Sequence, residues 1–384
     1  MSKFVASVAG VLAAALPGLA SAAGIQFLGA ALPTDLSQNG SVVVGNLPGS
    51  FETFRWTQAT GVVPLGRATV PVLGTGAGSP DVSWDGTKIS ATILSDAGTQ
   101  AVQGRWVQGD GWQQLGPLPP NSIPSGTSVG SAWGLSGDGS NVVGLFWTTN
   151  GRAHATSWTS AGGMIDLGAV TNRNSRASAT NYDGSVVVGW DGNAAGFPSR
   201  NPTLWINGVK TPLGEGTVDC ELTSVNADGT IVGGNWRGPG DPVRQAAIWR
   251  LTGSDWVRQD LGVLPGTAPD TPGAIVSDLS ADGSIAVGFN RFDNSSFNNT
   301  TGFFWSAATG MISANQLITN LGLTLPPDLQ ILDLTSVSPD GSTIAGIGVD
   351  AVGFQSFLIN IPEPGGLCLL GLTLPLLSRR RNRA

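Results

Sequence analysis

Seven short segments of this chain share one pattern, in which a polar turn ending in glycine separates two apolar runs. They read LSQNGSVVVG, VSWDGTKISA, LSGDGSNVVG, TNYDGSVVVG, VNADGTIVGG, LSADGSIAVG and VSPDGSTIAG. Their turn glycines are Gly40, Gly86, Gly139, Gly184, Gly229, Gly283 and Gly341, so successive repeats are 45 to 58 residues apart. Units of this length are too long for the rungs of a β-helix and fit the four-stranded blades of a β-propeller.

Each repeat predicts four short strands. Two of them flank the turn, because Asp-Gly or Asn-Gly between apolar runs is a strong hairpin signal in which both turn positions favour positive φ. The third strand ends in Trp in six repeats, and a further strand ends in Leu-Gly in five. The longest connections follow Leu-Gly, as expected for a crossing from the outer edge of one blade to the inner edge of the next. The strand before the turn is therefore expected innermost and the Leu-Gly strand outermost.

A small residue also recurs after each turn. The position five residues past the turn glycine is Gly in six repeats and Ala91 in the other. A residue without a large side chain is expected there so that neighbouring blades can approach closely.

The seventh repeat is one strand short, and the missing strand is present at the other end of the sequence. The segment GIQFLG, at residues 24–29, precedes the first repeat and matches the strand endings MIDLG and WQQLG. The sequence therefore predicts an all-β protein, a seven-bladed β-propeller over residues 23–361 that is closed by its N-terminal strand. Closure removes the exposed sheet edge that would otherwise promote aggregation. An open solenoid is the alternative, and it would need distinct capping repeats.

The first 22 residues indicate export. Lys3 precedes an apolar stretch from Phe4 to Leu19, and the small residues Ala20, Ser21 and Ala22 then form a signal peptidase site. A buried N-terminal helix is the alternative. The body at residues 23–361 keeps 14 of the 19 basic and 25 of the 26 acidic residues, a net charge of −11, which disfavours nucleic acid as a partner. Cys220 is the body's one cysteine, so no intrachain disulfide is expected.

The last 23 residues, 362–384, form a separate segment. Pro362, Glu363 and Pro364 are followed by an uncharged run at residues 365–378 and then by an arginine cluster. A helix of about 14 residues spans about 21 Å, which is short of the hydrocarbon core of a bilayer. Arginines after such a span favour a cytoplasmic C-terminus and an outward-facing body. A plain membrane anchor is the alternative.

Two known types of sequence resemble these features. The DG-S-VVVG turns, the HA…W strand at His154, Ala155 and Trp158, and MIDLG resemble the HAF-type repeats of exported bacterial surface proteins. The tail resembles a PEP-CTERM sorting signal. That resemblance implies a recognition hinge, a transient inner-membrane helix and a stop, cleaved by an exosortase-type membrane protease. Its sorting residues here are Pro362, Glu363, Pro364, Arg379, Arg380 and Arg381. It implies final residence at the cell surface or in the extracellular matrix of a Gram-negative-type bacterium.

The body offers few residues for catalysis, and no catalytic, cofactor-binding or metal-binding residue is expected. A Ser-His-Asp triad would need His154, whose repeat position other units fill with unrelated residues. The body has too few His and Cys residues to bind zinc, and the Asp-x-Asp-x-Asp-Gly calcium loop is absent. The aspartates before the turn glycines are explained by the hairpins. Asp219 and Glu221, two residues apart on an expected inner strand, would share one face and could line the channel, although ordinary solvated acids are the simpler interpretation.

Ligand contact is expected on the face that carries the loops between the second and third strands. Four consecutive repeats place an aromatic residue where the second strand ends, and polar residues lie nearby; the candidate ligand-binding set is Trp147, Trp190, Trp236, Phe289, Asp191, Arg237 and Asp241. Packing of these aromatics between blades is the alternative.

Two functions remain open from the sequence. The first is a non-catalytic surface or matrix protein that binds exopolysaccharide or another surface protein. The second is a glycan-degrading enzyme, similar to a glycoside hydrolase, that uses channel-facing carboxylates. The scarcity of His and Tyr favours the first.

Overall fold

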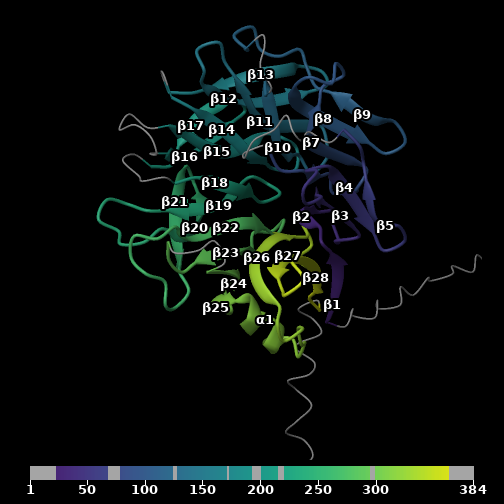
Figure 1. Cartoon of the computed structure of the whole chain (residues 1–384). Coiled ribbons are helices and arrows are strands. Elements are labelled where there is room, and N and C mark those ends of the chain that lie inside the picture. Colours follow the sequence, from purple (N-terminus) through teal and green to yellow (C-terminus); the bar gives the residue numbers. More distant parts are fainter. Residues whose placement is uncertain are drawn as a thin grey trace, which may run out of the picture. The chain divides into compact units, whose positions relative to one another are not determined.

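A ring of four-stranded antiparallel sheets makes up the body of the protein (Figure 1). The structure is a computed structural model that describes residues 23–67, 78–123, 128–170, 173–192, 200–214, 220–294 and 299–362. Within these residues the strands form seven sheets of four strands each. The seven-bladed propeller predicted from the repeats is confirmed.

Six blades are built from four strands that follow one another in sequence. The first three contain β2 (Leu32–Leu36), β3 (Val42–Asn46), β4 (Thr53–Thr57), β5 (Gly61–Pro64); β6 (Asp81–Val82), β7 (Lys88–Leu94), β8 (Ala101–Val107), β9 (Gly111–Gln114); and β10 (Gly130–Leu135), β11 (Asn141–Trp147), β12 (Ala153–Thr159), β13 (Gly163–Gly168). The next three contain β14 (Ser175–Thr180), β15 (Val186–Gly192), β16 (Arg200–Ile206), β17 (Val209–Pro212); β18 (Leu222–Val225), β19 (Ile231–Trp236), β20 (Gln245–Thr252), β21 (Asp255–Gly262); and β22 (Gly273–Leu279), β23 (Ile285–Arg291), β24 (Thr300–Ser306), β25 (Gly310–Ser313).

The seventh blade joins the two ends of the body. Its strands lie in the order β1 (Gly24–Gly29), β28 (Phe354–Asn360), β27 (Thr343–Val349), β26 (Gln330–Val337). β1 pairs antiparallel with β28 from Gly24 opposite Asn360 to Phe27 opposite Phe357, and the purple first strand lies beside the yellow last one in Figure 1. The predicted closure of the ring by the N-terminal strand is confirmed.

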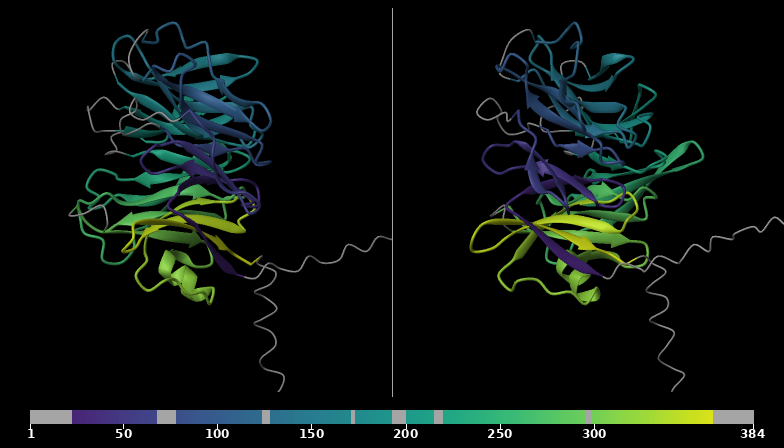
Figure 2. Two further views of the ribbon diagram at one scale, coloured as in Figure 1. Left: turned by 45° about the vertical axis from the view of Figure 1, so that its right-hand side comes forward. Right: turned by 90° about the vertical axis from the view of Figure 1, so that its right-hand side faces the viewer.

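The first strand of each blade lies nearest the axis of the ring. In Figure 1, β2, β10, β18, β22 and β26 surround the middle, whereas β5, β9, β13, β17, β21 and β25 lie at the periphery. Figure 2 shows the same blades from two further sides. Neighbouring first strands also contact one another, as β10 does with β14 and β22 with β26. The inner and outer assignments made from the sequence are confirmed.

A short helix interrupts the crossing from the sixth blade to the seventh. The helix α1 (Ala314–Asn320) begins after Ser313, whose hydroxyl accepts a hydrogen bond from the amide of Gln316. Its buried residues Ala314, Leu317 and Ile318 pack into the core between these blades. The repeats did not predict this helix. None of the helices among the described residues is long and apolar enough to cross a membrane.

The hairpin turns differ from the expected geometry in one respect. The turn glycines have positive φ, between 65° and 78°, but the Asp or Asn before each of them does not. The expectation that both turn residues adopt positive φ is therefore wrong. The aspartate keeps ordinary φ because its carboxylate accepts hydrogen bonds within the turn, as Asp85 does from the amide and hydroxyl of Thr87.

The recurrent glycine of the second strand is also explained differently. A Cβ on Gly45, Gly144 or Gly189 would lie 2.0 Å from a carbonyl oxygen of the first strand of the same blade. A bulge in the first strand of each of these three blades, such as the register shift between Pro33 and Asp35, directs this carbonyl toward the glycine. The partner that excludes a side chain is therefore the blade's own inner strand, and not the neighbouring blade as expected from the sequence.

Candidate functional site

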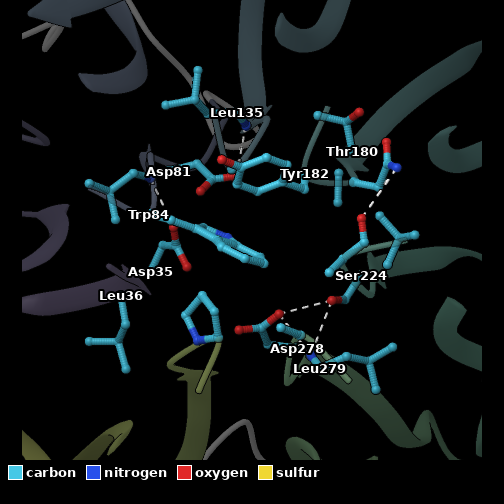
Figure 3. A pocket seen from close by; sticks show the side chains of 18 of the residues that line it. Asp35, Leu36, Asp81, Trp84, Leu135, Thr180, Tyr182, Ser224, Asp278 and Leu279 are labelled. Carbon is cyan, nitrogen blue, oxygen red and sulfur yellow. Dashed lines mark hydrogen bonds between the residues drawn. The ribbon is translucent and has the colours of Figure 1, made fainter. Parts of the chain in front are cut away.

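The central channel contains two spaces, one at each end of the inner strands. The wide cavity, with a volume of about 450 Å³, lies where the inner strands begin. The narrow cavity, with a volume of about 80 Å³, lies where they end and is shown in Figure 3. Asp35, Asp81 and Asp278 line both cavities, so they mark the constriction between them.

These three aspartates occupy one repeat position, five residues before the turn glycine. The same position is Ser224 in the fifth blade and Ser336 in the seventh, whereas it is Gly134 and Ala179 in the third and fourth. We call the three aspartates and two serines the carboxyl layer. It forms a polar floor along five of the blades, and the floor is apolar on the remaining two.

Each aspartate of the carboxyl layer links its own blade to the next. Asp35 accepts a hydrogen bond from the amide of Val82 at 2.8 Å, and Asp81 accepts one from Leu135 at 2.8 Å. Asp278 accepts one from the amide of Val337 at 3.0 Å. The recurrence of one contact in three blades shows that these carboxyls stabilise the blade interfaces as well as lining the channel.

The serines extend this network. Ser224 donates to Asp278 at 2.8 Å, a hydrogen bond that Figure 3 marks with a dashed line. The hydroxyl of Ser336 lies 2.8 Å from Asp278 and 3.2 Å from Asp35. The serines therefore connect the carboxyls of neighbouring blades.

Burial raises the pKa values of the aspartates that line the channel. It raises the pKa of Asp278 to about 7, with a further contribution from the charge of Asp35. Burial also raises the pKa of Asp333, on the wall of the wide cavity, to about 7. Burial and the neighbouring charge of Asp81 raise the pKa of Asp35 well above its usual range, and burial raises that of Asp81. These acids therefore hold protons well above the pH at which ordinary aspartates lose them.

One wall of the wide cavity carries a stack of aromatic and cationic groups. The guanidinium of Arg176 lies 3.9 Å from the ring centre of Trp133 and 5.8 Å from that of Trp190. Arg200 lies 4.6 Å from the ring centre of Trp190. Glu221 accepts from both arginines at 3.0 Å, so one carboxylate offsets two cations. Trp133, Arg176 and Glu221 line the cavity itself.

The narrow end is bounded by backbone hydrogen bonds between blades. The amide of Trp84 donates to the carbonyl of Gly137, that of Tyr182 to Ala227, and that of Ala227 to Ala281. The links Gln38 to Trp84, Asp138 to Tyr182, Ala281 to Pro339 and Asp340 to Gln38 continue round the axis. The rings of Trp84 and Tyr182 contact each other at the narrow cavity, with 4.7 Å between their ring centres (Figure 3).

The predicted ligand-binding residues occupy different settings. Phe289 lines the wide cavity, whereas Trp190 contacts the guanidinium groups of Arg176 and Arg200. Trp236 packs edge-on against the buried Trp249, at 6.3 Å.

The other members of that set lie in local contacts. Asp191 is buried and paired with Lys210, and Arg237 is paired with Asp270. Asp241 accepts from the amide of Gly238, and Trp147 ends β11 opposite Ala153. Among the described residues, Phe289 is the one member of the predicted set that lines the wide cavity.

The other sequence candidates also have defined places. Glu221 lines the wide cavity, whereas Asp219 falls outside the described residues. His154 Nδ1 lies 2.9 Å from Asp166, a pair on β12 and β13 that does not line either cavity. No cluster of three or more His, Cys, Asp or Glu side chains within the described ranges is arranged to hold a metal ion.

The remaining sequence calls concern the two ends of the chain. The signal peptide at residues 1–22 and the sorting residues Glu363, Pro364, Arg379, Arg380 and Arg381 lie outside the described residues, and Pro362 is the last residue described.

Sequence reasoning missed the carboxyl layer. It attributed the repeat aspartates to turns, which is correct for those next to the turn glycine. Aligning the repeats on that glycine also places Asp35, Asp81 and Asp278 in one column, five residues earlier. That column was the available signal.

Comparison with known proteins supports the fold. No protein-family model matches the sequence, and no curated protein matches it. Among solved structures, the chain is similar to the β-propeller domain of the trilobed protease from Pyrococcus furiosus. The identity is 10%, the TM-score 0.52, and the coverage 86% of this chain and 95% of that one. That domain is described as having an open velcro topology, whereas β1 closes the ring here.

Two other likenesses extend over less of the matched protein. A structure from a study of two prolyl endopeptidases matches with 11% identity and a TM-score of 0.52, covering 85% of this chain and 46% of that one. TolB from Acinetobacter baumannii matches with 13% identity and a TM-score of 0.43, covering 85% of this chain and 65% of that one. The chain thus spans less than two thirds of the length of both. At 10% and 11% identity, the likeness to the Pyrococcus furiosus domain and to the prolyl endopeptidase shows the fold alone.

Proposed function

We propose that this protein is an exported, non-catalytic β-propeller that binds polysaccharide in the wide cavity of its channel. The observation that carries the proposal is the cavity itself, about 450 Å³ in volume, on the face predicted for ligand contact. Its lining combines the aromatic rings of Trp133 and Phe289 with the charged pair Arg176 and Glu221. Flat apolar faces beside a few fixed polar groups are the elements that a sugar ring requires.

The location of the protein is part of this proposal. The signal peptide at residues 1–22 and the Pro-Glu-Pro tail support export, transient anchoring in the inner membrane and cleavage by an exosortase-type protease. The released propeller then functions at the cell surface or in the extracellular matrix, where it meets exopolysaccharide and other surface proteins.

A glycan array with the purified body Ala23–Ile361, which forms a compact unit by itself, tests the proposal. Binding to at least one polysaccharide, weakened about tenfold or more by Trp133→Ala, is the expected result. The absence of any glycan binding by a folded body would exclude this function and leave a surface protein as the partner.

A specific observation also favours a second function, glycan hydrolysis. Asp278 and Asp333 carry protons near neutral pH, since burial raises the pKa of each to about 7, and a protonated carboxyl is what a glycosidase needs as its general acid. A reducing-sugar assay on every glycan that binds distinguishes the two functions. Hydrolysis that is lost in Asp278→Asn or Asp333→Asn would establish the enzyme.

A further inference from the structure

We propose that the wide cavity receives the end of a glycan chain or short branch, inserted along the channel axis, and not an internal segment lying across the ring. This inference rests on the polysaccharide binding proposed above and specifies which part of the polymer is recognised. Three observations carry it: the contribution of all seven blades to the cavity wall, the constriction at its floor and the asymmetry of that floor.

All seven blades contribute to the wall of the cavity. The residue six positions before the turn glycine lines it in all seven repeats, and these residues are Thr34, Pro80, Trp133, Ser178, Thr223, Ser277 and Thr335. Arg176, Glu221 and Asp333 lie two residues earlier in their strands, and the carboxyl layer lies one residue later. An internal segment of a polymer continues in two directions, so it cannot descend into a space enclosed by all the blades. A chain end can.

The floor stops the ligand. Beyond the carboxyl layer the channel offers about 80 Å³, which holds a few water molecules and is too small for a sugar ring. Trp84 and Tyr182 contact each other across this narrow cavity. A glycan therefore cannot thread through the channel, and its terminal residue comes to rest at the level of Asp35 and Asp278.

The floor is asymmetric in a way that suits one terminal sugar. Asp35, Asp81 and Asp278 provide hydrogen-bonding groups on one side, whereas Ala179 leaves the opposite side without a polar side chain. Trp133 stands one position earlier, on the blade next to that of Ala179, with its ring stacked on Arg176. A terminal ring can place its apolar face toward Trp133 and its hydroxyls toward the carboxyls.

Competition by chains of different length tests the mode of binding. Soluble dextran, cellulose-type and chitin-type oligosaccharides would each be prepared as two fractions differing about tenfold in length, and each would compete for the array glycan. End recognition predicts that inhibition follows the molar concentration of chain ends, so the shorter fraction is about tenfold more potent at equal mass. Inhibition that follows total sugar mass, or that increases with length, would overturn the inference and leave polysaccharide binding intact. If a folded body binds no glycan on the array, the proposed function itself fails, and this inference with it.

A matched pair of variants tests where the ligand stops. Ala179 lines both cavities, whereas Ala227 lines only the narrow one. Ala179→Leu should reduce binding of the competing oligosaccharide at least about tenfold, because the added carbons occupy the floor. Ala227→Leu adds the same carbons beyond the constriction and should leave binding unchanged. Equal loss in both variants, with both melting like the parent, would show that the ligand passes the carboxyl layer. Wild-type binding by Ala179→Leu would show that it stops short of the floor.

Discussion

The hydroxyl of Ser336 in the last blade lies 3.2 Å from the carboxyl of Asp35 in the first blade, 301 residues away in sequence. The same hydroxyl lies 2.8 Å from Asp278. A serine hydroxyl has a single proton to donate, so both contacts are hydrogen bonds when one of the carboxyls is protonated. The junction between the ends of the ring is therefore held by groups whose protonation depends on pH.

The stability of the propeller should fall as the pH rises from about 4 to about 7. Asp278 and Asp333 have pKa values raised to about 7 by burial, against about 3.9 in an unfolded chain. In this window the folded state binds more protons than the unfolded state, so the free energy of unfolding decreases with pH, by up to about 1.4 kcal/mol per pH unit for each extra proton. Thermal melting between pH 4 and pH 8 measures this, and a stability that rises across the window would contradict it.

The turn aspartates act in the opposite direction and serve as an internal reference. Hydrogen bonds from Ser185 hold the pKa of Asp183 below its usual range, and bonds from Thr230 do so for Asp228. Their stabilisation is lost as the pH falls below about 4. Asp278→Asn keeps the shape of the protonated carboxyl, so it should reduce the decline above pH 4 by the contribution of Asp278 and leave the loss below pH 4 unchanged.

Removal of β1 should open the ring. Deleting Gly24–Gly29 leaves β28 with an unpaired edge and removes Ile25 from the core that contains Ile359. We expect a loss of several kcal/mol in the free energy of unfolding, or aggregation through the exposed edge. Chemical denaturation and size-exclusion chromatography measure the two effects. A body that lacks only Ala23 is the control. A deletion variant that stays monomeric and has the same melting temperature as this control would contradict a stabilising role for ring closure.

Two aromatic residues on the same face should respond differently to truncation. Phe289 lines the wide cavity, whereas Trp236 packs against the buried Trp249. Phe289→Ala should weaken glycan binding about tenfold and change the melting temperature by a few degrees at most. Trp236→Ala should lower the melting temperature more and leave the affinity of the remaining folded protein unchanged. The reverse pattern would place the site over Trp236, on the outer part of the rim.

The recurrent glycine of the second strand should not tolerate a methyl group. Gly144→Ala would bring its Cβ to 2.0 Å from the carbonyl oxygen of Ser131, which belongs to the backbone and cannot rotate away. We expect a loss of at least about 2 kcal/mol in the free energy of unfolding. Gly24→Ala is the control, because its Cβ would have 4.0 Å to the nearest atom. Equal melting temperatures for the two variants would contradict the steric explanation.

Processing of the tail gives a prediction that is independent of the ligand. Replacing Glu363 and Pro364 by Ala should leave the uncleaved precursor in the inner membrane, because the proposed sorting signal would lose its recognition hinge. Intact-mass analysis of the released wild-type protein should find no residues beyond the Pro-Glu-Pro hinge. Detection of Arg381 in the released form would show that the tail is not a sorting signal.

The fold could be predicted from the sequence because each blade repeats its own local signals. The turn glycines fix the hairpins, and the orphan segment at residues 24–29 identifies the closing strand. The site was less predictable because it depends on which residues the ring brings together. Asp35 and Asp278 are 243 positions apart in the numbering, and their common role follows from the repeat alignment and the closure together. The stack of Trp133 on Arg176 joins adjacent blades whose side chains no local pattern relates.

The pairing of β1 with β28 also fixes the order in which the molecule can be completed. Among the described strands, β1 is synthesised before all the others and its partner β28 after all the others, so β1 cannot pair until every blade has been synthesised. Contacts of such long sequence separation form late, since the entropy of closing the whole chain must be overcome before they contribute. A chain cut short anywhere before Phe354 retains an unpaired first strand. An incomplete copy therefore exposes a strand edge on which other chains can pair, whereas the closed ring covers that edge.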